Sequence, residues 1–199
     1  MGPGVDRRAE VVRAAVALFA EQGYKETTAS EIAQRAGISR RSFFYYFRSK
    51  DDVLFSIDPE VLERLTTVVA EQADELTDLG AVANAWKALG LLAGHADRSR
   101  TTQLRRAAEG SPVLRGKELE LHLAYRDATA RGLARRRGLP EPDDRARSAA
   151  AMGQSLMHLV IDQWIIDPHS DRDELIDRYF DAAVEAAFER QALDSRRRT

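Results

Sequence analysis

The stretch TASEIAQRAGISRRSFFYYFRSK, residues 28–50, decides the fold of this chain. It opens with Thr28-Ala-Ser-Glu31, a capping box in which a hydroxyl and a carboxylate satisfy the first free N–H groups of a helix. Gly37 suits the positive φ that a helix end and a tight turn require. Ser39 is a second N-cap. The pattern predicts two short helices joined by a tight turn, a helix-turn-helix whose second helix starts at Arg40.

The second helix carries positive charge where a structural helix disfavours it. Arg40 and Arg41 occupy its first turn, where the helix macrodipole is already positive. Guanidinium groups match DNA phosphates and guanine edges, and recognition helices insert their N-terminal residues into the major groove. Five basic residues and no acidic residue lie between Arg35 and Lys50, so the positive field is local although the formal net charge is -2.

Five consecutive aromatic residues, Phe43 to Phe47, span more than one helical turn, so they cannot all face one core. Phe43 and Phe47 are i,i+4 neighbours, and we expect them to point inward. This leaves Tyr45 and Tyr46 as an outward pair that reaches phosphates or thymine methyl groups, with Phe44 between the two roles.

Other segments resemble the TetR family: Gly23-Tyr24, then Thr-Thr-Ala-Ser-Glu-Ile-Ala at 27–33, Ala-Gly-Ile-Ser at 36–39 and Phe-Phe-Tyr-Tyr-Phe-x-Ser-Lys at 43–50. The resemblance implies a DNA surface formed by the recognition helix, phosphate contacts by Thr28 and Lys50, and a base-facing Ser30. Phe44 departs from the tyrosine usual in the family, which removes one expected phosphate contact. The predicted DNA-contacting residues are Thr28, Ser30, Ser39, Arg40, Arg41, Ser42, Tyr45, Tyr46 and Lys50.

The remaining sequence has helical periodicity and no strand pattern. We expect an all-α chain with a helix-turn-helix DNA-binding domain at 1–50 and a larger helical ligand-binding and dimerisation domain at 51–199. Pro59 implies a kink or a restart within the first helical stretch of the second domain. The expected helices cover residues 7–22, 51–77, 82–96, 102–108, 114–137, 144–166 and 172–193.

Family resemblance implies a homodimer whose last two helices form a four-helix interface. Small and apolar residues in these helices permit close approach and offer area to bury. The alternative is that they complete the core of a single chain. The expected interface residues are Ala149, Gly153, Leu156, Val160, Trp164, Tyr179 and Phe180.

The second domain is expected to enclose a small-molecule effector site. Candidate lining residues combine an apolar body with a polar tip, although each is also a common core or surface residue. They are Trp86, His95, His122, Tyr125, Met152 and His158. Similarity to an actinobacterial TetR subgroup near the mycofactocin-system regulators suggests fatty acyl-CoA, or another hydrophobic compound, as the effector.

The sequence contains none of the common hydrolase, metalloprotease, P-loop or dinucleotide motifs, so we expect no enzyme activity, cofactor or metal. His158 and Asp162 have i,i+4 spacing but are too few for a metal site. With 0 cysteines and no apolar leader or spanning segment, we expect a cytoplasmic protein without a membrane partner. We expect a repressor on a pseudo-palindromic operator; a helical protein-interaction module is the competing hypothesis, and steep salt dependence of binding distinguishes the two.

Overall fold

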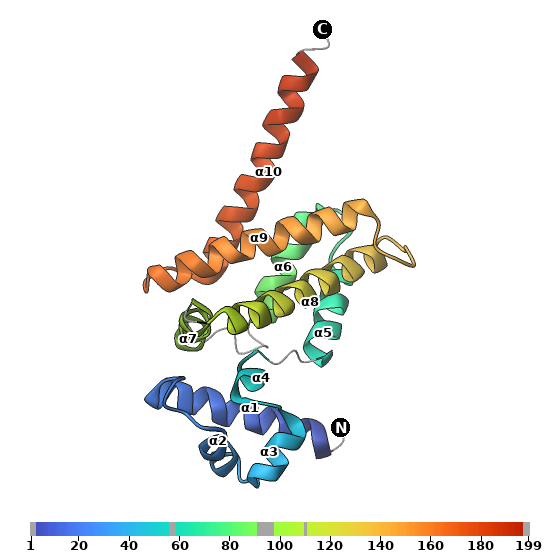
Figure 1. Cartoon of the computed structure of the whole chain (residues 1–199). Helices are drawn as coiled ribbons and strands as arrows, with labels where there is room; N and C mark the ends of the chain where they lie inside the picture. Colours follow the sequence, from blue (N-terminus) through green and yellow to red (C-terminus); the bar gives the residue numbers. More distant parts are fainter. Residues whose placement is uncertain (1–2, 56–58, 91–97, 110, 197–199) are drawn as a thin grey trace. The chain divides into compact units, whose positions relative to one another are not determined.

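The computed structural model describes residues 3–55, 59–90, 98–109 and 111–196, and every regular element in them is an α-helix (Figure 1). The all-α prediction is confirmed. Pro59 is the first residue of a new helix, because its missing N–H is tolerated in the first turn and its ring would break a helix interior. The helices are α1 (Pro3–Gln22), α2 (Ala29–Arg35), α3 (Arg40–Tyr46), α4 (Lys50–Leu54), α5 (Pro59–Ala70), α6 (Asp78–Gly90), α7 (Arg98–Glu109), α8 (Pro112–Arg136), α9 (Asp144–Ile166) and α10 (Arg172–Arg196).

The chain divides into two compact units that are discontinuous in sequence. The first comprises residues 1–57 and 97–121, and the second comprises residues 58–96 and 122–199. Helix α8 therefore supplies its first turns to the first unit and the rest of its length to the second. The boundary expected after residue 50 does not anticipate this return of the chain, which brings Ala108 and Leu114 into the core of the first unit.

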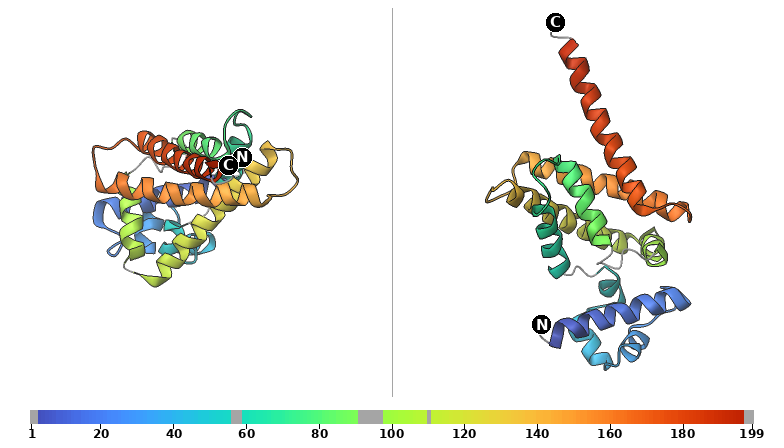
Figure 2. Two further views of the ribbon diagram at one scale, coloured as in Figure 1. Left: turned by 90° about the horizontal axis from the view of Figure 1, so that it is seen from above. Right: turned by 180° about the vertical axis from the view of Figure 1, so that it is seen from behind.

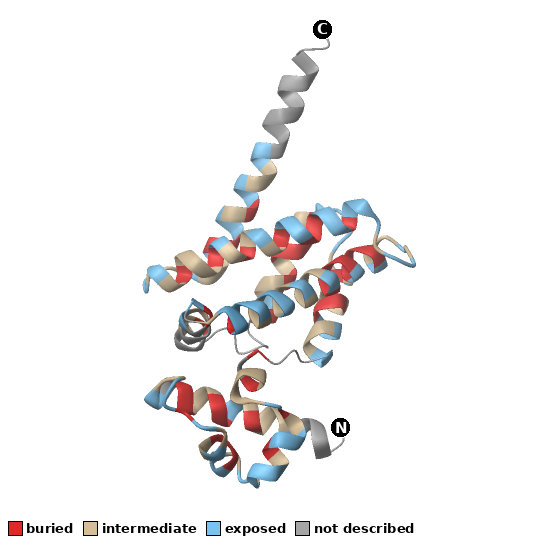
Figure 3. Cartoon of the chain, viewed as in Figure 1, coloured by how far each residue is buried: buried red, intermediate tan, exposed pale blue. Residues whose placement is uncertain are grey.

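In the first unit, α2, α4 and α7 pack against α1, and α3 packs against α2. Phe19, Ile32 and Phe43 are fully buried at the centre of this core, which Figure 3 shows as red positions on the inner sides of the helices. Asp52 of α4 accepts hydrogen bonds from Arg48 and from Lys117 in the first turns of α8. Burial raises the pKa of Asp52, but the bonds from Lys117 and Arg48 outweigh it and hold that pKa below its ordinary value.

The second unit packs α5, α6, α8, α9 and α10 around a separate apolar core. Two glycines permit close helix approach: a Cβ on Gly132 of α8 would lie 2.7 Å from the Thr66 carbonyl oxygen of α5, and one on Gly153 of α9 would lie 2.7 Å from Val82 Cγ1 of α6. The first half of α10 packs on α9 and α6, and its second half extends beyond them (Figure 2).

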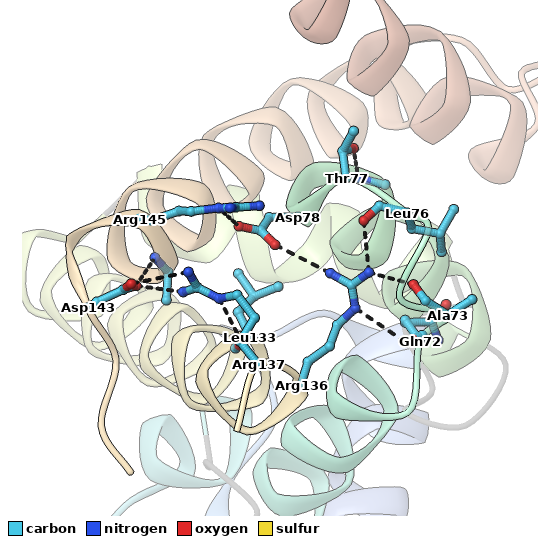
Figure 4. A network of polar contacts seen from close by, with 12 residues as sticks. Gln72, Ala73, Leu76, Thr77, Asp78, Leu133, Arg136, Arg137, Asp143 and Arg145 are labelled. Atoms are coloured by element: carbon cyan, nitrogen blue, oxygen red, sulfur yellow. Dashed lines mark hydrogen bonds and ion pairs between the residues drawn. The ribbon is translucent and has the colours of Figure 1, made fainter. Parts of the chain in front are cut away.

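An ionic network centred on the buried Asp78 carboxylate joins three segments of this second unit (Figure 4). The Asp78 carboxylate at the start of α6 accepts bonds from Arg136 of α8 at 3.3 Å and from Arg145 of α9 at 2.6 Å. Arg136 also donates to the carbonyls of Gln72 and Leu76 in the loop between α5 and α6, at 3.2 and 2.8 Å. The network therefore fixes the end of α8 to that loop and to the start of α6, and fixes the start of α9 to the start of α6.

Candidate functional site

The helix-turn-helix is closed by local hydrogen bonds. The Gly37 N–H donates to Gln34 O at 3.1 Å, and the Ile38 N–H donates to Ala33 O at 2.9 Å. Gly37 has φ of 66°, a conformation that glycine adopts without the steric penalty of a Cβ. The turn thus holds α3 at a fixed angle to α2, as predicted for this motif.

The N-terminus of α2 has the predicted capping box. The Glu31 N–H donates to Thr28 Oγ1 at 3.2 Å, and the Thr28 N–H donates to Glu31 Oε2 at 2.7 Å. Hydrogen bonds from the Thr28 side chain and then its backbone N–H lower the pKa of Glu31. Thr28 and Ser30 are both exposed at this end of α2, so both are accessible to a molecule that binds there.

The first turn of α3 presents two arginines to solvent. Ser39 caps the helix by accepting the Ser42 N–H at 3.0 Å, and the two serine hydroxyls are 2.9 Å apart. Arg40 and Arg41 are exposed, and no acidic residue lies in this turn. The Arg40 guanidinium lies 5.6 Å from the centre of the Phe44 ring, within range of a cation–π contact.

The five aromatic residues separate into an inner and an outer group. Phe43 and Phe47 are buried, as predicted, whereas 84% of Tyr45 and 45% of Phe44 are exposed. Tyr46 is half-buried and packs against the core of the first unit. Tyr45 and Tyr46 therefore do not form the outward pair expected from the sequence. Phe44 is the exposed neighbour of Tyr45, because Tyr46, one turn before α4, faces the core.

Two of the basic residues in this stretch bind partners that lie far away in sequence but within the same unit. Arg35 forms a fork with Glu21 of α1, with nitrogen–oxygen distances of 2.9 and 2.6 Å. The Lys50 ammonium donates to the carbonyls of Tyr24, Lys25 and Thr27 instead of pointing into solvent. These partners lie 14 or more positions away in sequence, so no local spacing signals them.

The candidate effector residues form two ring contacts in the second unit. The rings of Trp86 on α6 and Tyr125 on α8 are 5.4 Å apart. Those of His122 on α8 and His158 on α9 are 4.6 Å apart and nearly perpendicular. His122 and Tyr125 share one face of α8 because they are three residues apart. Met152 is exposed on α9, and His95 lies outside the described residues.

Two family descriptions together match most of the chain. Residues 11–57 match the bacterial regulatory proteins of the tetR family, and residues 80–188, more than half of the chain, match the MftR C-terminal domain. The chain belongs to the TetR family. Its second part is of the MftR type, which confirms the resemblance to mycofactocin-system regulators, and this TetR-family member is a helix-turn-helix transcriptional regulator.

Individual relatives of this regulator agree with the assignment. The HTH-type transcriptional regulator TcmR of Streptomyces glaucescens is 28% identical over 98% of this chain and 88% of that protein. The fatty acid metabolism regulator protein of Bacillus subtilis is 33% identical over 48% of this chain and 50% of that protein. The FadR chain in the crystal structure of FadR from Bacillus subtilis in complex with stearoyl-CoA is 26% identical in sequence to this chain. The two structures match with a TM-score of 0.60, covering 87% of this chain and 95% of that chain.

Most residues expected at the dimer interface of this TetR-family chain lie inside one protomer. Ala149, Gly153, Val160, Trp164 and Phe180 are buried in the core of the second unit. Leu156 and Tyr179 are half-buried and pack against the same core. The large apolar side chains that α9 leaves exposed are others, namely Met152, Leu159 and Ile166.

Within the described residues of this regulator, no group of three or more histidine, aspartate or glutamate side chains is arranged to hold a metal ion. None of the helices in the described ranges is long and apolar enough to cross a membrane.

Proposed function

We propose that this regulator is a repressor that binds a pseudo-palindromic operator as a homodimer and releases it when a small hydrophobic effector binds. The observation that carries the proposal is the surface of α3, where Arg40, Arg41 and Tyr45 are exposed on a helix whose start and turn are fixed by hydrogen bonds. A preorganised helix N-terminus with two guanidinium groups suits insertion into a major groove. The chain acts by binding in this proposal, without catalysis.

The two parts of the chain have separate roles in the proposal. Residues 1–50 read DNA, with phosphates or bases contacted by Thr28, Ser30, Ser39, Ser42 and the exposed side chains of α3. Residues 51–199 hold the effector and the partner subunit, although residues 97–121 fold with the DNA-reading part.

We propose a long-chain acyl-CoA as the effector class. The FadR structure that resembles this chain is a complex with stearoyl-CoA. In this chain, Trp86 and Tyr125 form one ring contact, and His122, on the same face of α8 as Tyr125, forms another with His158 of α9. The effector must prefer the state that cannot bind DNA, because a ligand with equal affinity for both states shifts no population.

A stripe on α9 is the proposed contact with the second subunit. Met152, Leu159 and Ile166 are exposed and seven residues apart, which places them along one seam of the helix. Exposed apolar residues on one seam are typical of a helix that packs against another helix. This seam lies beside the buried face of α9 that contains Val160, because adjacent residues of a helix are about 100° apart.

The experiment begins with a duplex selected from a random-sequence library by the purified protein, labelled and measured by fluorescence anisotropy. Specific binding that weakens steeply with salt supports a DNA regulator, and Arg41→Ala is expected to weaken it without changing the size of the protein in sedimentation. Addition of stearoyl-CoA should release the duplex, whereas CoA alone and stearate serve as controls. Failure to select any sequence would favour the interaction-module hypothesis, and binding unaffected by stearoyl-CoA would reject the effector class.

A further inference from the structure

Lys50 is the first residue of α4, and its side chain points into the loop between α1 and α2. Its Nζ atom lies 2.7 Å from Tyr24 O, 2.9 Å from Thr27 O and 3.1 Å from Lys25 O. An ammonium group has three N–H donors and no acceptor. The three carbonyls therefore occupy the whole donor capacity of Lys50.

The surroundings of this ammonium suit a permanent structural position. It also lies 4.4 Å from the centre of the Tyr24 ring, in cation–π range. Burial lowers the pKa of Lys50, while Glu26 and Glu31 act in the opposite direction. The loop thus surrounds the charge with carbonyl oxygens and an aromatic face, and the carboxylates of Glu26 in the loop and Glu31 in α2 act on it as well.

The segment that Lys50 holds leads directly into the helix-turn-helix. Thr27 is fully buried, and its Oγ1 donates to Gly23 O at 2.8 Å. The next residue, Thr28, is the N-cap of α2. A fixed loop at 24–27 therefore determines the position of the start of α2. The turn at Gly37 in turn holds α3 relative to α2.

We propose that Lys50 is a positioning residue for DNA recognition, acting through the 24–27 loop and contacting no phosphate. The inference rests on the proposed function, since it concerns how the DNA-reading helices are held. A lysine that moved out to a phosphate would leave three carbonyls without their shared donor, and unsatisfied polar groups of this kind oppose such a movement.

The test uses the full-length protein with Lys50→Met and Lys50→Arg. Methionine keeps most of the stem and removes the charge, whereas arginine keeps the charge but replaces the compact ammonium by a planar fork. Lys25→Met is the matched control, because Lys25 is an exposed lysine of the same loop whose carbonyl is unaffected by the change. Arg41→Ala serves as the reference for loss of a direct DNA contact.

Two measurements are made on each variant. Amide hydrogen exchange of the loop and of the first turn of α2 is measured without DNA. Affinity for the duplex selected by the wild-type protein is measured across a series of salt concentrations. If the wild-type protein selects no duplex, the proposed function fails, but the exchange measurement still tests the role of Lys50 in the loop.

Faster exchange at the loop is expected in Lys50→Met and Lys50→Arg and not in Lys25→Met. Both Lys50 variants should bind DNA about tenfold more weakly, equivalent to about 1.4 kcal/mol, with the wild-type dependence of log K on log salt. A phosphate contact predicts a different result: the slope falls by about 0.9 in Lys50→Met and Lys50→Arg restores affinity. That outcome, or unchanged loop exchange, overturns the proposal; if Lys50→Met does not fold, Lys50→Arg alone decides between the two.

Discussion

Substitution of Asp78 by asparagine tests the ionic network that joins α6, α8 and α9. The side chains of Asp78 and Arg136 are only 7% and 5% exposed. Removing one partner of a buried ion pair costs about 3–5 kcal/mol, because the other charge stays buried without compensation. Arg136 keeps carbonyl acceptors in the loop before α6, so we expect a loss at the lower end, about 3 kcal/mol.

The assay is urea unfolding followed by circular dichroism at one protein concentration, because the stability of a dimer depends on concentration. A loss of this size should also lower Tm by about 6–12 °C for a chain of this length. Glu63→Gln is the matched control, since Glu63 pairs with Arg135, the sequence neighbour of Arg136, but both side chains are more than half exposed. We expect the control to cost about 0–1 kcal/mol. If Asp78→Asn lowers the free energy of unfolding no more than Glu63→Gln does, the reasoning is wrong, because burial of the Asp78 ion pair then does not determine its contribution to stability.

Three further predictions address the cap, the dimer and the helix packing. Glu31→Gln should destabilise the protein near neutral pH, because hydrogen bonds lower the pKa of Glu31 in the folded state. The greater stability of the wild-type protein should be complete above about pH 4.3, the ordinary pKa of glutamate, and should disappear as pH falls through the lowered pKa. Unfolding curves of both proteins across this pH range test the prediction. Leu159→Glu should yield monomers in sedimentation and weaken operator binding, whereas Leu123→Glu, also at an exposed apolar position, should leave the size unchanged; a dimeric Leu159→Glu protein would place the interface elsewhere. Gly132→Ala should cost about 1–3 kcal/mol by overpacking, because the added methyl would meet α5, whereas Gly116→Ala on the same helix meets no atom within 4 Å and should stabilise α8 by up to about 1 kcal/mol; equal effects of the two changes would contradict the packing argument.

The helix-turn-helix was predictable because its signals are local. The capping box pairs Thr28 with a residue three positions later, and Gly37 stands at the one backbone position of the turn with positive φ. The i,i+4 spacing of Phe43 and Phe47 indicated the buried face of α3. Each of these interactions joins residues within one or two helical turns, so the spacing of the residues in the sequence is enough to predict it.

The partners of the charged residues were not predictable in the same way. Lys50 binds carbonyls 23 to 26 positions earlier, and Arg136 binds Asp78 58 positions earlier. A basic residue in a basic stretch has the same appearance in sequence whether it faces DNA or the protein interior. The two outcomes differ only in tertiary structure, and for Lys50 the observed carbonyl contacts are the basis of the proposed change of role, from phosphate contact to support of the recognition motif.

Helix α9 shows why periodicity alone does not identify an interface. The helix has two apolar seams, one that includes Val160 and another that includes Leu159, and both repeat at helical spacing. Family resemblance indicated that α9 takes part in dimerisation but not which seam does so. The larger and more continuous seam forms part of the core of a single chain, because it packs against α6 and α10 of the same chain. The sparser seam, interrupted by polar residues, is the exposed one and the proposed contact with a partner, so in this proposal the weaker apolar pattern is the better sequence signal for the interface.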